Sequence, residues 1–414
     1  MTQPTTFKTA LGRAWQVCLV KAGRLLKQWA TPAGPHYILE LTAQCTQSCR
    51  YCYNVWKLAP GICGAELDTR TWCDLIAKLQ DETGCLRITL SGGEPLVRED
   101  FRQILAFCHR RGLRSILITN GQRLDAATLD FCLAHGVRMF ELTLLGADAA
   151  THDALTRTPG SWERALAAMS RLYRAGATWC GVFVATRENI AQVRATVELL
   201  IALGARVVMF NRFNPGGAGA QVLDLMPSAP QVETALDELD GLAAQYGVRP
   251  VAAIPIMPCL VDIQAFPRVE FAFCPVGQVN AYPTIGPGGQ VRPCNHSATI
   301  LGDFRVQWMR EILDSPTWHA FRAEIPEICR PCPGLETCRA GCRAAAEVCF
   351  GSPAVPEPWL EANLDRLSGR SRTGADPVGP AGPGGGFPVR VAAGGEISAR
   401  DVRGVGSSRA LSAD

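Results

Sequence analysis

The sequence predicts an α/β protein in which six βα units form a parallel sheet that curls into a partial barrel, followed by a small cysteine-rich domain. From residue 37 onward, short apolar runs alternate with longer segments of helical periodicity, a pattern typical of a parallel sheet covered by helices. Right-handed crossovers curl such a sheet into a partial barrel. Near Cys259, proline, glycine and cysteine become frequent and the apolar runs shorten, which indicates a small domain held by metal.

The expected strands and helices follow each other in regular order. The strands cover residues 37–42, 86–90, 115–119, 139–144, 180–185 and 207–211. The helices lie near residues 68–82, 99–112, 125–135, 161–175 and 189–203, with a sixth after Pro227. In the fifth helix, Ile190, Val193, Val197 and Leu200 repeat at helical spacing. In such a barrel, the loops at the carboxyl ends of the strands carry the chemistry.

Composition divides the chain into four segments. Residues 1–36 contain an amphipathic helical pattern, which we interpret as a helix packed on the main domain, with a membrane surface as the alternative. The barrel is expected over residues 37–250 and the cysteine-rich domain over residues 251–360. Residues 369–414 are rich in Gly, Pro, Ser and Arg and poor in bulky apolar side chains, a composition that predicts disorder.

Charge and composition exclude several classes of protein. The 414 residues include 41 basic and 38 acidic side chains, and this near balance gives no electrostatic footprint for nucleic acid. No apolar run is long enough to span a bilayer, and the N-terminal region does not have the pattern of a signal peptide. The chain has 18 cysteines. We therefore expect a cytoplasmic protein whose clustered cysteines bind metal or perform redox chemistry.

Three cysteines follow the first expected strand at short spacing, in the segment Cys45-Thr-Gln-Ser-Cys49-Arg-Tyr-Cys52. Three thiolates at this spacing can bind three irons of one cubane, and the fourth iron then keeps an open position. An incomplete zinc site or three incidental cysteines would be the alternatives. The position at a strand end favours a substrate-binding cluster.

This Cys-x3-Cys-x2-Cys loop, with Tyr51 just before its last cysteine, resembles the radical S-adenosylmethionine (SAM) superfamily. The resemblance implies that the open iron chelates the amino and carboxylate groups of the methionine part of the cofactor. It also implies that an electron from the [4Fe–4S] cluster breaks a sulfur–carbon bond and releases a 5′-deoxyadenosyl radical.

Motifs at later strand ends extend the resemblance. Gly92-Gly93-Glu94-Pro95 follows the second strand and is similar to the motif that holds the methionine amino group. Thr119-Asn120-Gly121 resembles the Thr-Asn-Gly turn of the family, and Thr143-Leu144-Leu145-Gly146 resembles its Ser-Leu-Asp-Gly motif, with Leu145 in place of Asp. The cofactor-binding residues implied by this resemblance are Gly92, Gly93, Glu94, Asn120 and Thr143.

Two further stretches continue the same resemblance. His152-Asp153, together with Pro159-Gly160-Ser161, matches the family pattern, although a helix start with Ser161 as N-cap explains it equally well. The loop over residues 211–217 resembles the loop that contacts adenosine, and a plain turn is the alternative.

A second group of cysteines lies in the C-terminal part. It reads Cys274-x14-Gly289-x4-Cys294, then Cys329-x2-Cys332-x5-Cys338-x3-Cys342, and finally Cys349. The pattern resembles the SPASM domain, a C-terminal module of radical peptide-modifying enzymes that carries two auxiliary [4Fe–4S] clusters. A zinc ribbon is the alternative, because Cys-x2-Cys pairs also bind zinc.

The SPASM resemblance also implies two ligand sets. The first auxiliary cluster would be bound by Cys274, Cys294 and Cys342. The second would be bound by Cys329, Cys332, Cys338 and Cys349. Two complete sets need eight ligands, and Cys259 is a candidate eighth; an open iron on the first auxiliary cluster is the alternative.

These features predict an oxidoreductase that uses SAM and three [4Fe–4S] clusters to modify a ribosomally synthesised peptide, by a crosslink or a dehydrogenation. Auxiliary clusters suit oxidative chemistry because they can accept the electron that the substrate loses. The alternatives are formylglycine formation, as in sulfatase maturation, and a small-molecule reaction in cofactor or tetrapyrrole biosynthesis. A ferredoxin-like carrier is disfavoured, since it needs no ligand for an amino acid.

The expected partners follow from this reaction. They are a peptide substrate and an electron donor such as ferredoxin or flavodoxin. Only 36 residues precede the first expected strand, too few for a fused winged-helix domain, so we expect a separate leader-binding protein or recognition on the barrel surface. The sequence assigns no catalytic base.

Overall fold

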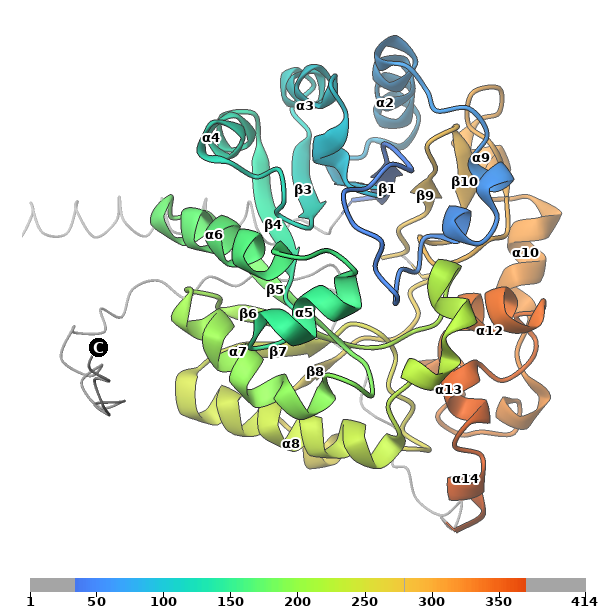
Figure 1. The fold of residues 1–414 in the computed structure, drawn as a ribbon. Coiled ribbons are helices and arrows are strands. Elements are labelled where there is room, and N and C mark those ends of the chain that lie inside the picture. The colour runs from blue at the N-terminus through green and yellow to red at the C-terminus, as the bar shows by residue number, and fades with distance from the viewer. Residues whose placement is uncertain (1–33, 279, 370–414) are drawn as a thin grey trace, which may run out of the picture.

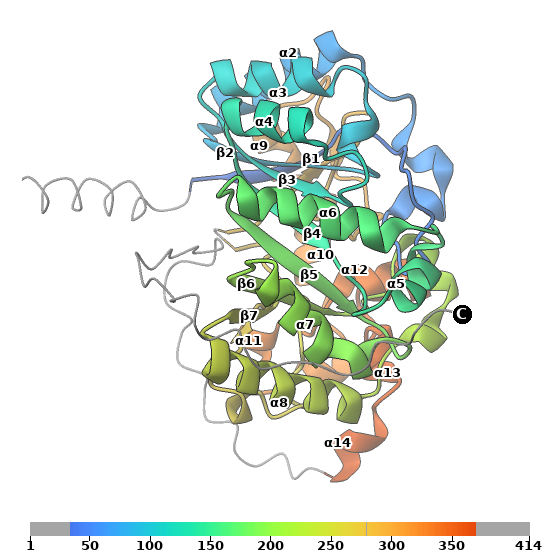
Figure 2. The same ribbon diagram turned by 60° about the vertical axis from the view of Figure 1, so that its left-hand side comes forward.

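The computed structural model describes residues 34–278 and 280–369 (Figure 1). The expected N-terminal helix therefore lies outside the described residues, as do Val279 and all of the expected disordered tail except Gly369, which ends a helix. The described chain forms one sheet with the strand order β11-β10-β9-β1-β2-β3-β4-β5-β6-β7-β8. Figures 1 and 2 show the sheet curving, with the helices that connect its strands on the outside.

The strands are short and mostly parallel. Neighbours from β1 to β8 all pair in parallel. Their bounds are β1 (His36–Glu40), β2 (Arg87–Ser91), β3 (Arg114–Thr119), β4 (Val137–Thr143), β5 (Trp179–Ala185), β6 (Val207–Arg212), β7 (Arg249–Ala252), β8 (Glu270–Phe271), β9 (Thr284–Ile285), β10 (Gln290–Arg292) and β11 (Gly302–Asp303). The six expected strands are confirmed as β1 to β6.

The helices fall into two groups. Those between the strands are α2 (Thr69–Thr83), α3 (Phe101–Arg110), α4 (Ala126–Ala134), α5 (Ala149–Thr156), α6 (Ser161–Arg174), α7 (Val193–Ala202) and α8 (Ala229–Tyr246). Those of the C-terminal segment are α9 (Met309–Ile312), α10 (Pro316–Ala323), α11 (Leu335–Cys338), α12 (Arg343–Phe350), α13 (Pro358–Glu361) and α14 (Asp365–Gly369). The six expected helices are confirmed, and α5 is an additional helix.

Helix α5 has a clear start signal that periodicity alone does not reveal. The side chain of Asp148 accepts a hydrogen bond from the backbone N–H of Thr151 at 2.8 Å, which is an N-cap. The helix has only eight residues, of which His152, Leu155 and Thr156 are buried. So short an apolar face falls below what a window of helical periodicity detects.

The two faces of the sheet are lined by alternate residues. On β1, Tyr37 and Leu39 belong to the large core beneath the helices. On β5 and β6, Cys180, Val182 and Met209 form a separate small apolar cluster. Because successive side chains of a strand point to opposite faces, this second cluster lines the interior of the barrel, which we call the lumen.

The C-terminal segment extends the barrel sheet and shares its core. Strand β9 pairs in parallel with β1, and β10 pairs antiparallel with both β9 and β11. Phe304, Trp318 and Trp359 belong to the same apolar core as the barrel residues. The sequence predicts a domain held by metal, and the structure adds this shared core to that expectation. Within the described residues, no helix has the length and hydropathy needed to cross a membrane.

Candidate active site

The cysteine loop after β1 is fixed at one end by the loop after β2. The backbone N–H of Gly93 donates to the carbonyl of Thr42 at 2.7 Å, and that of Glu94 donates to the carbonyl of Gln44 at 2.8 Å. A Cβ atom on Gly92 would lie 2.4 Å from the carbonyl oxygen of Thr42, and one on Gly93 would lie 2.1 Å from that of Gln44. Only glycine permits so close a backbone approach.

The same loop is fixed further along by α5. The backbone N–H groups of Ser48 and Arg50 donate to the carbonyls of Thr156 and Leu155, at 3.3 and 2.9 Å. These carbonyls lie in the last turn of α5, where helical partners are missing and outside donors are needed. The guanidinium of Arg50 also pairs with Glu188 at 2.7 Å. Backbone hydrogen bonds with the loop after β2 and with the end of α5 therefore position the cysteine loop.

The three thiols of this loop are close enough to affect one another. Burial, followed by the charge of Cys52, raises the pKa of the Cys49 thiol to about 12, and Cys45 adds to the rise. Buried thiolates that repel each other are stabilised by a bound metal, and thiolate is the ligand that iron–sulfur clusters require. Within residues 34–278 and 280–369, no three His, Cys, Asp or Glu side chains converge tightly enough for a single metal ion. The fit of the loop to a cluster therefore rests on the chemistry of its donors.

Glu94 connects the loops after β2 and β3. Its carboxylate accepts hydrogen bonds from the hydroxyl of Thr119 at 2.8 Å and from the backbone N–H of Asn120 at 2.7 Å. The side chain is fully buried, and burial raises its pKa to about 7. The amide of Asn120 in turn donates to the hydroxyl of Thr46 at 3.0 Å and to the sulfur of Cys45 at 3.7 Å. Glu94 thus acts on the cysteine loop through Asn120.

The structure brings four of the five expected cofactor residues together with the cysteine loop. Gly92, Gly93, Glu94 and Asn120 form one connected group. Thr143 stands apart at the carboxyl end of β4, which lies two strands from β2 in the sheet. It is half-buried there, on the same edge of the sheet as the other motifs.

The alternative interpretation, a helix start with Ser161 as N-cap, is right about the helix start and wrong about the cap. Helix α6 has Gly160 as its N-cap residue, and Ser161 is its first helical residue. The cap is supplied by Asp153 of α5, whose carboxylate accepts from the backbone N–H groups of Gly160 at 2.6 Å and Trp162 at 2.9 Å. Asp153 therefore joins α5 to α6.

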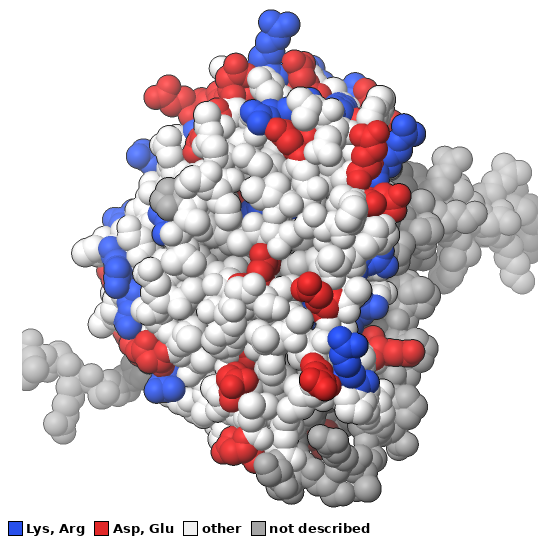
Figure 3. All heavy atoms as spheres, turned by 90° about the vertical axis from the view of Figure 1, so that its right-hand side faces the viewer, with Lys and Arg blue, Asp and Glu red and all other residues white. Residues whose placement is uncertain are grey.

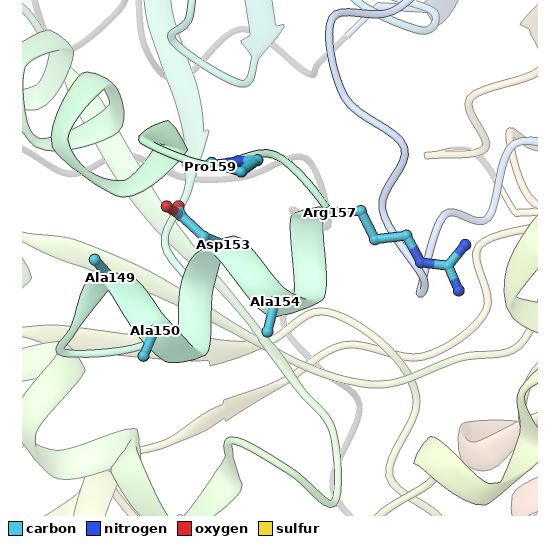
Figure 4. Close-up of a pocket in the computed structure, with 6 residues that line it drawn as sticks. All are labelled: Ala149, Ala150, Asp153, Ala154, Arg157 and Pro159. Atoms are coloured by element: carbon cyan, nitrogen blue, oxygen red, sulfur yellow. The ribbon is translucent and has the colours of Figure 1, made fainter.

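A shallow pocket lies along α5. Its lining residues are Ala149, Ala150, Asp153, Ala154, Arg157 and Pro159. Figure 4 shows the Arg157 side chain extending away from the helix toward the ribbon of the cysteine loop. Arg157 also ends α5 with a φ of 51°. The pocket is mostly apolar and lies on the helix that supports the cysteine loop, not among the thiols.

The three cysteines assigned to the first auxiliary set lie together. Burial, followed by the charge of Cys274, raises the pKa of the Cys294 thiol to about 12. Burial also raises the pKa of the Cys342 thiol, with contributions from Glu357, Cys294 and Cys274. The guanidinium of Arg343 lies 3.9 Å from the sulfur of Cys274.

A cysteine outside the motif-implied second set lies near one of its members. Burial, followed by the charge of Cys259, raises the pKa of the Cys338 thiol to about 12, and Cys329 contributes as well. Burial and then Cys332 raise the pKa of Cys329 to about 11. For Cys349, burial and Glu357 raise the pKa to about 11, with no cysteine among the causes. The structure therefore places Cys259 near Cys338.

Aromatic and amide side chains connect the cysteine loop to the first auxiliary set. The ring of Tyr53, next to Cys52, stacks on the ring of His296 with a centroid distance of 4.3 Å. The amide nitrogen of Asn214 lies 3.2 Å from Nδ1 of His296 and 3.2 Å from the sulfur of Cys342. These contacts form a continuous path between the two groups of thiols.

A buried ion pair fastens the C-terminal segment to the end of β6. Arg212 and Glu357 are both fully buried, and their side chains are joined by hydrogen bonds of 2.6 and 2.8 Å. Glu357 also accepts from the backbone N–H of Cys342 at 3.1 Å, and the guanidinium of Arg212 lies 4.6 Å from the ring centroid of Trp359. A second buried pair joins Arg292 of β10 to Glu40 of β1.

Sequence reasoning missed these four charged residues and the path through Asn214 and His296. Arg212 and Asn214 lie in the stretch compared with the adenosine-contacting loop, but their partners are 145 and 82 positions away. An arginine within an apolar strand is a weak signal of a buried pair, because buried charges need partners.

Comparisons with known proteins agree with this geometry. Residues 39–200 match the model of the radical SAM superfamily, and residues 274–333 match that of an iron–sulfur cluster-binding domain named SPASM. The chain is 32% identical to the PqqA peptide cyclase of Ruegeria pomeroyi over 351 residues, which covers 82% of this chain and 90% of that protein. It is 30% identical to the PqqA peptide cyclase of Methylocella silvestris, covering 79% and 87%.

Two solved structures share the fold. The structure of anSMEcpe with bound AdoMet superposes with a TM-score of 0.62 at 14% identity, covering 80% of this chain and 96% of that one. The structure of Streptococcus suis SuiB bound to the precursor peptide SuiA gives a TM-score of 0.60 at 16% identity, covering 86% and 81%. Together with the sequence relatives, the likeness confirms the expected architecture. The chain belongs to the radical SAM superfamily, as an enzyme that binds SAM and [4Fe–4S] clusters and carries a SPASM domain.

Proposed function

We propose that this enzyme oxidatively modifies a ribosomally synthesised peptide, by forming a crosslink or by dehydrogenation. The observation that carries the proposal is the 32% identity to a PqqA peptide cyclase across 90% of that protein. The arrangement of the site supports it, because contacts through Tyr53, His296 and Asn214 connect the cysteine loop to the first auxiliary set.

Each group of residues has a role in this reaction. Cys45, Cys49 and Cys52 would hold the first cluster, while the backbone at Gly92 and Gly93, together with Asn120 and Thr143, would bind SAM. Glu94 fixes the position of Asn120. When bound, the clusters supply the electron that releases a 5′-deoxyadenosyl radical and can accept the electron that the substrate later loses.

The exposed surface suits a peptide. Figure 3 shows that the face on the right of Figure 1 is mostly uncharged, with a few Asp or Glu side chains in and below its middle and most Lys and Arg side chains toward its edges. An uncharged surface binds through backbone hydrogen bonds and apolar contacts, which are the interactions that an extended peptide offers. A ferredoxin or flavodoxin would supply the electron, and leader recognition would use a separate small protein or the barrel surface.

The direct test measures peptide mass. Anaerobically reconstituted enzyme is incubated with SAM, a reductant and either a PqqA-type peptide or a short peptide encoded beside the gene. The converted peptide should be about 2 Da lighter, the mass of two hydrogens removed by radical chemistry. Deuterium at the attacked carbon should appear in 5′-deoxyadenosine. Cofactor cleavage that no peptide stimulates, with a small metabolite consumed instead, would contradict the proposal.

We further propose that Cys329, Cys332, Cys338 and Cys259 hold the second auxiliary cluster, and that Cys274, Cys294 and Cys342 hold the first. The matched variants Cys259→Ala and Cys349→Ala test the fourth ligand. Cys259→Ala should lose up to about four of about twelve irons, the content of one cubane out of three. Cys349→Ala should keep them, and the opposite result would restore the ligand set implied by the motif.

A further inference from the structure

Glu141 is a carboxylate in the barrel lumen that the site described above does not use. It lies in β4, whose register places it between Ile118 of β3 and Cys180 of β5. Its chain neighbours Phe140 and Leu142 belong to the core beneath the helices. Because side chains alternate along a strand, Glu141 points the other way, into the lumen. It lies two residues before Thr143, on the same face.

The surroundings of Glu141 are apolar and leave it without a partner. Its β5 neighbour Cys180 belongs to the apolar lumen cluster, and Ile118 on β3 is half-buried. Among the residues that the structure describes, none forms a hydrogen bond or an ion pair with Glu141. Glu40, another lumen carboxylate, is neutralised by Arg292. Glu141 nevertheless keeps part of its surface accessible in the middle of a central strand.

Glu141 also lies on the side of the lumen that faces the first auxiliary set. Burial raises the pKa of Tyr282, and the next contributions come from Cys294, Cys274, Cys342 and Glu141. Tyr282 is therefore near both the carboxylate and these thiols. The position of Glu141 is thus flanked by a cofactor motif at the end of its own strand and by the auxiliary cysteines beyond Tyr282.

The protonation state of Glu141 suits proton transfer at neutral pH. Burial in the apolar lumen is the cause that raises its pKa, from 4.5 to about 7. A general base works best when its pKa lies near the operating pH. Its position on a strand, rather than on a loop, fixes it relative to the cofactor motifs.

We propose that Glu141 is a catalytic residue that accepts a proton from the peptide radical during its oxidation. The assignment rests on the proposed function, in which the peptide loses two hydrogens. One leaves as a hydrogen atom and forms the new C–H bond of 5′-deoxyadenosine. The other leaves as a proton, which forms an O–H bond with the Glu141 carboxylate, and as an electron, which reduces an auxiliary iron–sulfur cluster.

The test compares Glu141→Gln with Glu141→Asp. The amide keeps the side-chain volume but cannot accept the proton, so the rate of formation of the lighter peptide should fall about 10²- to 10⁴-fold. Formation of 5′-deoxyadenosine should change by less than about twofold, because it does not need the base. Glu141→Asp should recover part of the lost rate. The matched control is Glu163→Gln, which removes an exposed carboxylate from α6 and should leave the rate unchanged.

A second readout follows the carboxyl group without turnover. Difference infrared spectroscopy of the reconstituted protein without peptide should show a protonated carboxyl band at pH 6 that disappears by about pH 8, around the raised pKa. Glu141→Gln should lack this band. The titratable groups that face Glu141 are Cys180 and Tyr282, whose own pKa values burial raises, so neither loses its proton in this range.

The pH dependence of turnover should match. In the unmodified enzyme, product formation should rise with pH through an apparent pKa of about 7, because only the carboxylate accepts a proton. An unchanged rate and pH profile in Glu141→Gln would overturn this assignment alone. Failure of the unmodified enzyme to lighten any peptide would overturn the proposed function, and the assignment with it.

Discussion

The two cysteine-bearing regions of this enzyme are held in place by different kinds of contact. The cysteine loop after β1 is fixed by backbone hydrogen bonds, from Gly93 and Glu94 at one end and to the last carbonyls of α5 at the other. In the C-terminal group, the backbone of Cys342 is held by the buried carboxylate of Glu357, which pairs with Arg212. Apart from Gly92 and Gly93, where a Cβ would clash, backbone contacts tolerate changes of side chain, whereas a buried ion pair depends on both partners. The two regions should therefore respond differently to substitution.

The largest expected effect comes from removing the three cysteines of the first region, which should leave the clusters of the second region in place. The triple change Cys45→Ala, Cys49→Ala and Cys52→Ala should abolish cofactor cleavage and remove about four of about twelve irons. The visible absorbance of the auxiliary clusters should remain, because their ligands lie elsewhere. Iron analysis and 5′-deoxyadenosine assays check both points. Loss of all the iron would mean that the two regions do not assemble independently.

The next effect concerns the second region. Glu357→Gln leaves the Arg212 charge buried without a counter-ion, which should cost about 3–5 kcal/mol of the free energy of unfolding. Chemical unfolding of the reconstituted protein measures it. The control is Asp240→Asn, which breaks a pair whose Arg268 side chain is 53% exposed and should cost less than about 1 kcal/mol. Equal losses in the two variants would contradict the distinction between the regions.

A smaller effect is expected where a side chain supports the first region. Glu94→Gln removes the charge from the hydrogen bonds to Asn120 and Thr119, so SAM affinity should fall roughly ten- to hundredfold, or about 1.5–3 kcal/mol. Equilibrium binding to the reconstituted enzyme measures it. Glu99→Gln, an exposed neighbour, should bind normally. If Glu94→Gln binds as tightly as the unmodified enzyme, the backbone contacts alone position the site.

The smallest expected loss of stability comes from a contact between the two regions. Tyr53→Leu removes the stack on His296 and should lower the free energy of unfolding by about 0.5–1.5 kcal/mol. Tyr53→Phe keeps the ring and should lose less. Thermal unfolding of both variants compares them. A larger loss of stability in Tyr53→Phe than in Tyr53→Leu would show that the Tyr53 hydroxyl, and not its ring, connects the two regions.

The sequence predicted the first region better than the second. The first six strands and the motifs at their ends were predictable, because apolar alternation and fixed spacing are local signals. Strands β9 to β11 have two or three residues each, too few for any periodicity. The count of eight ligands pointed to Cys259, but its closeness to Cys338 could not be predicted, since it depends on how distant turns pack.

The lumen shows a related limit. Alternation along β4 could place Glu141 on the face opposite Phe140, but not decide which face carried the helices. Its lack of a partner becomes visible only when the surrounding strands are in place. The sequence showed only an acidic residue within an apolar strand. A carboxylate in a buried ion pair, such as Glu40 with Arg292, has the same pattern, so the sequence could not tell a catalytic carboxylate from a structural one.

The pairing of Glu40 in the first strand with Arg292 in the tenth also constrains how the protein is made. The two residues are 252 positions apart in the chain. At a synthesis rate of roughly 5–20 residues per second, the first strand waits about 13–50 s on the ribosome before its partner is translated. During that time the edge of β1 that β9 later covers is unpaired, and unpaired edges promote aggregation. Chaperones that bind extended segments therefore have the longest time to bind at β1, the strand that precedes the cysteine loop.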